Sequence, residues 1–137
     1  MQCARILIVE DEFLVALDLE AALTEFGHDC AGIAPDLETA MRLADTKPDL
    51  ALVDINLRDG PTGPQIAEHL TRDHGVVVLF VTANPRMAPA GLAGAVGVLS
   101  KPCDGNVIRA AIAYALDRRN GAPLMAPPAG LMLFDQT

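Results

Sequence analysis

Several side chains that could bind a metal ion or a phosphoryl group come at or just after the ends of short apolar runs. Carboxylates that lie close together repel one another unless a cation lies between them, and Mg²⁺ is the oxygen-liganded ion that suits such a group. A lysine ammonium and a hydroxyl suit a phosphoryl group better than a second metal ion. If the fold brings them together, these side chains predict a joint site for a divalent cation and a phosphate. They are Glu10, Asp11, Asp54, Thr82 and Lys101.

The apolar runs alternate with longer amphipathic segments along most of the chain. Runs rich in β-branched residues predict strands buried on both faces, and apolar residues at helical spacing predict helices between them. Two prolines and three glycines between residues 84 and 97 oppose a regular helix there, so a helix in this segment is expected to be short or irregular. We expect strands near 6–9, 30–33, 50–53, 76–81 and 98–99, and helices near 13–26, 36–45, 66–74 and 107–116.

This order of elements predicts an α/β fold with a parallel sheet and helices on both faces, because right-handed crossovers leave few alternatives. In such a sheet, ligands bind outside the carboxyl ends of the strands. The candidate residues all follow predicted strands, so we expect them to converge on one site. A purely structural alternative is that Asp11 or Glu12 caps the first helix and that Thr82 and Lys101 are solvated groups at strand ends.

The composition of the chain excludes several classes of function. The chain has 137 residues, about the size of one domain, with 10 basic and 18 acidic residues and a net charge of −8. Direct nucleic-acid binding is not expected, because it needs clustered basic residues. No apolar run approaches the roughly 20 residues that span a bilayer, and the N-terminus does not resemble a secretory signal. With an odd number of cysteines and no metal-ligand spacing among them, the chain is expected to be a cytoplasmic protein with reduced thiols.

Four motifs, in this order along residues 4–119, resemble those of the receiver domain of two-component response regulators. They are Val9-Glu10-Asp11-Glu12, Leu52-Val53-Asp54-Ile55-Asn56, Val81-Thr82-Ala83 and Leu99-Ser100-Lys101-Pro102. The resemblance implies a flavodoxin-like, doubly wound fold. It has a five-stranded parallel sheet of order 2-1-3-4-5, with helices on both faces and, in this chain, a short or irregular fourth helix.

The resemblance also implies a role for each residue. Asp54 would be the phosphoacceptor, taking a phosphoryl group from the phosphohistidine of a histidine kinase or phosphotransfer protein. Such a domain signals through a partner protein and is not an enzyme that turns over a free substrate. The implied metal ligands for Mg²⁺ or Mn²⁺ are Glu10, Asp11, Asp54 and the backbone carbonyl of Asn56, and the implied phosphoryl ligands are Lys101, Thr82 and the backbone N–H of Ala83. The Lys-Pro peptide would be cis.

Other functions stay open at this point. The chain could be a stand-alone relay or phosphate-sink receiver without an output domain. An Asp-based, metal-dependent phosphohydrolase would need a second acid two residues after Asp54, where Asn56 stands instead. A flavodoxin-like nucleotide or flavin binder would need a loop rich in glycine or hydroxyl residues after the first strand, where the sequence has Glu-Asp-Glu.

Two features depart from the family pattern. Receivers usually carry an aromatic residue three positions before the lysine, and this chain has Val98 there. The segment 84–96 is short and rich in proline and glycine. We therefore expect phosphorylation to be sensed by ordering of residues 84–96 rather than by an aromatic rotamer. Receivers commonly dimerise through the face formed by their fourth helix, fifth strand and fifth helix. Because this chain departs from the family on that face, a homodimer of that kind is not expected, and homodimerisation by another route stays an open alternative.

Residues 1–119 are expected to form the receiver domain, and residues 120–137 a proline-rich, apolar C-terminal tail or truncated linker. Two alternatives stay open for the apolar stretch 131–134: a free, flexible end, or docking on the last helix or on a neighbouring chain.

Overall fold

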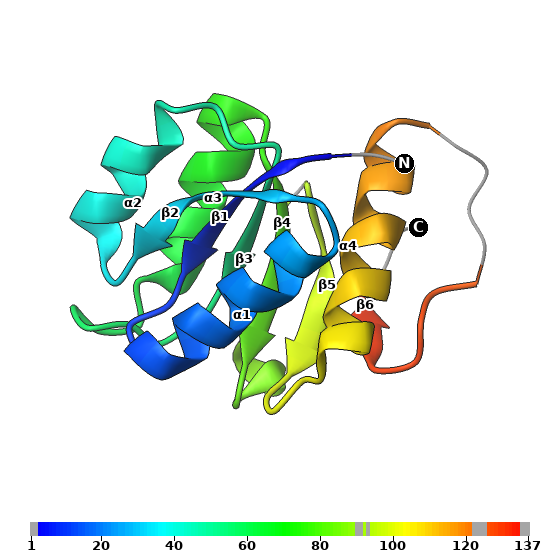
Figure 1. The fold of residues 1–137 in the computed structure, drawn as a ribbon. Helices are drawn as coiled ribbons and strands as arrows, with labels where there is room; N and C mark the ends of the chain where they lie inside the picture. The colour runs from blue at the N-terminus through cyan, green and yellow to red at the C-terminus, as the bar shows by residue number, and fades with distance from the viewer. Residues whose placement is uncertain (1–2, 90–91, 93, 122–125, 135–137) are drawn as a thin grey trace.

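The structure is a computed structural model, and it describes residues 3–89, 92, 94–121 and 126–134. Strands and helices alternate from the N-terminus as the apolar runs predict (Figure 1). The strands are β1 (Arg5–Val9), β2 (Asp29–Ala34), β3 (Leu50–Val53), β4 (Val77–Thr82), β5 (Ala95–Ser100) and β6 (Leu131–Leu133). The helices are α1 (Phe13–Glu25), α2 (Leu37–Ala44), α3 (Gly63–His74), α4 (Gly105–Arg119) and the short 3₁₀ helix η1 (Pro85–Met87).

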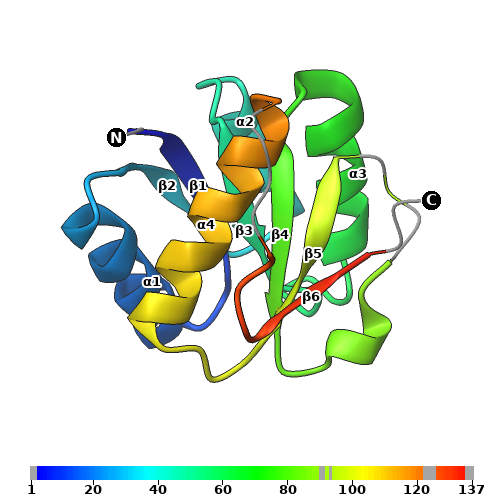
Figure 2. The same cartoon turned by 90° about the vertical axis from the view of Figure 1, so that its right-hand side faces the viewer.

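The sheet has the order β2-β1-β3-β4-β5-β6, and its first five strands are parallel. This order confirms the predicted 2-1-3-4-5 arrangement. The five predicted parallel strands are all present, and the structure adds a sixth strand, β6, which pairs antiparallel with β5 at the edge of the sheet. Residues 131–133 lie beside residues 97–99 in this pairing, as Figure 2 shows.

Helices cover both faces of the sheet. α1 and α4 lie over one face and enclose one apolar cluster, while α2 and α3 enclose the other (Figures 1 and 2). β1 and β3 are almost fully buried between these layers, as expected for strands that read as continuous apolar runs. Among the described residues, no helix has both the length and the apolar run needed to span a bilayer.

The segment between β4 and β5 has no α-helix among its described residues. Only the 3₁₀ turn η1 forms, and residues 90, 91 and 93 lie outside the described part of the chain. The sequence expectation of a short or irregular fourth helix is therefore met for residues 84–89. β5 is longer than predicted, since it begins at Ala95 and runs to Ser100.

The stretch 131–134 does not lie free, and it docks on β5 rather than on a helix alone. Leu131 is buried in the cluster under α1 and α4, and Phe134 is buried in the cluster on the α2–α3 side. The Phe134 ring packs edge-on against Phe80 of β4, with ring centroids 6.1 Å apart. Phe134 therefore covers apolar surface on the face of the sheet that α2 and α3 also cover.

Candidate functional site

The carboxyl ends of the neighbouring strands β1 and β3 bring three acids together. Backbone hydrogen bonds continue the sheet past the strand ends: the Glu10 N–H donates to Ala34 O at 2.9 Å, and the Asp54 N–H donates to Val9 O at 2.9 Å. As a result, one carboxylate oxygen from each of Glu10, Asp11 and Asp54 lies within 4.8 Å of the other two. Glu10 and Asp54 are buried, and Asp11 is exposed to solvent.

Lys101 reaches this acidic cluster from the end of β5. Its Nζ lies 2.8 Å from Asp54 Oδ2 and 2.5 Å from Glu10 Oε1. The Lys101 backbone N–H donates to Thr82 O at 2.9 Å, which ties the residue to the end of β4. The Lys101–Pro102 peptide is cis, as the resemblance implies.

Burial and pairing shift the ionisation of these groups. Burial raises the pKa of the Glu10 carboxyl above its usual value, although the hydrogen bond from Lys101 acts in the opposite direction. Burial alone would lower the pKa of Lys101, but its hydrogen bonds and charge interactions with Asp54 and Glu10 outweigh burial and raise it. The lysine ammonium is therefore the counter-charge of the two buried acids.

The second oxygen of each buried acid is held by the backbone. Asp54 Oδ1 accepts the N–H of Ile55 at 2.7 Å, and Glu10 Oε2 accepts the N–H of Glu12 at 3.1 Å. Glu12 occupies the N-cap position of α1 without a side-chain cap hydrogen bond. The structural alternative in which Glu12 caps this helix through its side chain is therefore wrong.

A surface cavity of about 240 Å³ opens next to Asp54. The Thr82 hydroxyl is buried at the end of β4 and accepts the N–H of Asn84 at 3.1 Å. Most of the phosphoryl and metal ligands that the sequence predicts line this cavity. Glu10 and Lys101 do not line it, but both lie next to Asp54. The cavity is lined by Asp11, Glu12, Asp54, Asn56, Leu57, Thr82, Ala83 and Asn84.

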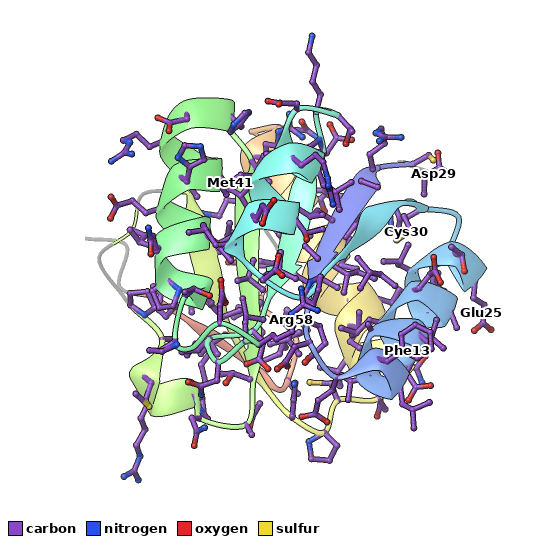
Figure 3. All side chains as sticks on the ribbon, turned by 90° about the vertical axis from the view of Figure 1, so that its left-hand side faces the viewer. Phe13, Glu25, Asp29, Cys30, Met41 and Arg58 are labelled. Atoms are coloured by element: carbon purple, nitrogen blue, oxygen red, sulfur yellow. The ribbon has the colours of Figure 1, made fainter. Side chains whose placement is uncertain are left out.

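The loop that follows Asp54 is fastened to the start of α2, which the sequence analysis did not foresee. The Arg58 guanidinium, labelled in Figure 3, forms an ion pair with Asp36, the N-cap residue of α2. Asp59 Oδ2 accepts the N–H of Leu37 at 3.0 Å. The sequence shows Asp59-Gly60 only as a turn, because the partners of Arg58 and Asp59 lie 22 residues away.

Gly63 is a second positioning residue that sequence reasoning missed. It is the first residue of α3, and a Cβ at this position would lie 2.0 Å from the backbone oxygen of Asp54. Its φ angle is not positive, so the close approach of α3 to Asp54 is what requires glycine here. Gly63 lies only nine residues after Asp54, but nothing in the sequence indicates that the two backbones come into contact.

The donor set fits a hard divalent cation. With all four groups ionised, the three carboxylates and the one ammonium leave a net charge of −2 at the end of the sheet. Carboxylate oxygens within a few ångströms of one another, one of them open to solvent, are the ligands that Mg²⁺ uses in proteins.

The sequence is similar to that of known proteins. Residues 6–113 match the family model of the response regulator receiver domain. The chain is 42% identical over 82 residues to the phyllosphere-induced regulator PhyR of Methylorubrum extorquens, a match that covers 58% of this chain and 31% of PhyR. It is 36% identical over 119 residues to the transcriptional regulatory protein PdtaR of Mycobacterium tuberculosis, covering 83% of this chain and 57% of PdtaR.

The fold also matches a solved structure over nearly its whole length. The solution structure of the receiver domain of Erythrobacter litoralis PhyR superposes with a TM-score of 0.79 at 34% identity. This match covers 92% of the present chain and 98% of that domain. By contrast, the present chain spans less than two thirds of the full length of either curated relative.

Proposed function

The chain belongs to the response regulator receiver domain family, and on that premise we propose that Asp54 is its phosphoacceptor. The observation that carries the proposal is the position of the Asp54 carboxylate. It is buried at a strand end, 2.8 Å from the Lys101 ammonium and next to two further acids. In this setting the Asp54 carboxylate can accept a phosphoryl group to form an acyl phosphate, while the two neighbouring acids bind a divalent cation and the lysine binds a phosphoryl oxygen.

The reaction would transfer a phosphoryl group from a phosphohistidine of a histidine kinase or phosphotransfer protein. An Asp54 carboxylate oxygen attacks phosphorus, a P–O bond forms, and the P–N bond breaks. The electron pair of the broken bond stays on the imidazole nitrogen of the donor. Such transfers depend mainly on positioning and charge neutralisation, which the fixed loop and strand ends supply.

Three groups of this chain would bind the transferred phosphoryl oxygens. The Lys101 ammonium would exchange its contact with Asp54 Oδ2 for a phosphoryl oxygen. The Thr82 hydroxyl and the backbone N–H of Ala83, which line the cavity beside Asp54, would donate to others. Mg²⁺ or Mn²⁺, held by Glu10, Asp11, Asp54 and the Asn56 carbonyl, would supply neutralisation of the phosphoryl charge.

The output would be a protein interaction and not the turnover of a free substrate. A stand-alone relay or sink receiver remains the second candidate. The phosphohydrolase alternative is not favoured, because an amide and not an acid stands two residues after Asp54, in the cavity wall.

Phosphorylation would be signalled without an aromatic side chain that changes its rotamer. Val98 is a buried aliphatic residue at the position where the family usually has an aromatic one. We therefore keep the proposal that the segment 84–96 gains order on phosphorylation. Slower amide hydrogen exchange of this segment with beryllofluoride and Mg²⁺ would support it, and unchanged exchange would contradict it.

The phosphoacceptor proposal is tested by incubating the protein with acetyl phosphate and Mg²⁺ and measuring its intact mass. We expect the mass of one added phosphoryl group on the wild type and none on Asp54→Asn. An adduct of equal yield on both proteins would contradict the proposal.

A further inference from the structure

The strand β6 is the shortest strand of the described sheet and lies at its edge. It has three residues and pairs only with β5, on the side away from β4 (Figure 2). On the outer side of β6, the described residues form no further strand. A short strand at an edge detaches at a lower free-energy cost than the buried central strands, since few contacts hold it.

Few side chains hold β6 in place. Leu131 is buried against the cluster under α4, and Phe134 is buried against Phe80 on the opposite face. The Phe134 N–H donates to Val96 O at 3.1 Å. Met132 lies between these anchors and is 52% exposed. Leu133 is half-buried and packs against the same cluster as Leu131. Three side chains of the four-residue stretch 131–134 therefore hold it to the core.

The contact between β6 and β5 leaves no spare room at Gly97. A Cβ at this position would lie 2.4 Å from the Met132 carbonyl oxygen. The φ angle of Gly97 is not positive, so the backbone conformation does not require glycine. The close approach of β6 is what requires it. Because the two strands pack this closely, a shift of either one weakens the contact between them.

The two strands that hold β6 are also the two that end in the phosphoryl site. Phe80 lies two residues before Thr82 on β4. Residues 97–99, which pair with β6, come directly before Ser100 and Lys101. The Lys101 backbone is bonded to Thr82 O, so the two strand ends are linked. Any rearrangement of Lys101 and Thr82 around a phosphoryl group acts on the strands against which β6 packs.

We propose that β6 covers the edge of β5 while Asp54 is unmodified and is released when Asp54 carries a phosphoryl group. This inference rests on the proposed function of Asp54. Release leaves the backbone N–H and C=O groups of the β5 edge unpaired. That edge then accepts an extended segment of a partner protein that pairs antiparallel with β5 and carries apolar side chains on both faces, as β6 does.

The first test follows β6 directly in the full chain. Amide hydrogen exchange is measured for peptides covering residues 131–134, with and without beryllofluoride and Mg²⁺. A bound-fluoride signal in ¹⁹F NMR establishes that the phosphate mimic is in place. We expect faster exchange in 131–134 for the wild type and no change for Asp54→Asn.

The outcomes separate the two proposals. A bound-fluoride signal with unchanged or slower exchange in 131–134 overturns the release of β6 and leaves the phosphoacceptor proposal standing. If no fluoride binds to the wild type, the function of Asp54 itself is wrong, and this inference falls with it.

A second test uses reciprocity, because coupling between two sites acts equally in both directions. If modification of Asp54 releases β6, then loosening β6 must tighten beryllofluoride binding. We expect Phe134→Ala to raise the affinity by about 5-fold or more. Met132→Ala, two residues earlier and exposed, is the matched control and should leave the affinity unchanged.

Gly97→Ala repeats this test from the β5 side, without removing any side chain of β6. We expect it to raise the affinity as Phe134→Ala does. If both variants are folded by circular dichroism and bind beryllofluoride as the wild type does, the proposed coupling is overturned.

Discussion

The Lys101 ammonium lies 2.8 Å from Asp54 Oδ2, although 47 residues separate the two in the sequence. Asp54 is buried, and the side chain of Lys101 is only 14% exposed, so little solvent is available to compensate either charge. Glu10 shares the same ammonium. Modification of Asp54 must therefore rearrange the pairing of Lys101, which makes this lysine a sensitive point at which to test the site.

Replacing Lys101 with Met should destabilise the protein at neutral pH. The substitution keeps an unbranched side chain but leaves the Glu10 and Asp54 carboxylates without their counter-charge. We expect a loss of about 3 kcal/mol in the free energy of unfolding, measured by urea denaturation. The double variant Lys101→Met/Asp54→Asn should recover part of this loss. A Lys101→Met protein as stable as the wild type would show that the ion pair contributes nothing.

Mg²⁺ should raise the melting temperature of the protein, because it binds the folded acidic cluster and not the unfolded chain. At a concentration of about 100 times the Kd, the stabilisation should be about 2.7 kcal/mol. Asp11→Asn should abolish most of the shift. Glu25→Gln, which changes an exposed acid at the other end of α1 and outside the acidic cluster, is the control and should retain it. An equal shift in both variants would argue against Asp11 as a ligand.

Gly63→Ala should disturb the backbone at Asp54. The added Cβ would lie 2.0 Å from Asp54 O, so α3 must move outwards, at a cost of about 1–3 kcal/mol. Gly105 is the first residue of α4, and a Cβ there would lie 3.9 Å from the Cβ of Ala22, an ordinary van der Waals distance. Gly105→Ala should therefore be neutral or slightly stabilising. Thermal unfolding compares the two variants, and an equal effect in both would contradict the packing argument.

The contribution of the Asp36 charge to the stability of the fold should disappear at low pH. The hydrogen bond from the Thr39 N–H, aided by Arg58, lowers the pKa of Asp36 to about 2. A carboxyl whose pKa is lower in the folded than in the unfolded chain stabilises the fold above its unfolded pKa of 3.8, and this effect is lost as the pH falls towards 2.

Asp36→Asn isolates this charge, because Asn caps helices about as well as Asp. We expect the variant to be less stable than the wild type at pH 6 and the difference to close between pH 4 and pH 2. Urea unfolding at several pH values measures this difference. A difference that stays constant down to pH 2 would rule out the Asp36 charge as its source.

The central site could be predicted from the sequence because its residues follow strand ends. Once β1, β3, β4 and β5 are recognised as parallel neighbours, their carboxyl ends must meet at one edge. The grouping of Glu10, Asp11 and Asp54 follows directly. Apolar runs of this kind are the strongest local signal in an α/β sequence.

The contacts that sequence reasoning missed depend on residues far apart in the chain. β6 has only three residues and follows a proline-rich stretch, so no periodicity marks it as a strand. Gly63 and Gly97 look like loop and strand glycines, and only the neighbouring backbone shows why each lacks a side chain. The ion pair of Arg58 with Asp36 depends on the packing of the β3–α3 loop against α2.

The most direct measurement of the central claim is to locate the modified residue. After phosphorylation with acetyl phosphate and Mg²⁺, borohydride reduces an aspartyl phosphate to homoserine, and peptide mass spectrometry finds its position. The proposed function predicts homoserine at residue 54 alone. Homoserine at residue 11, or a phosphoryl group on a histidine or hydroxyl side chain with residue 54 unchanged, would contradict it.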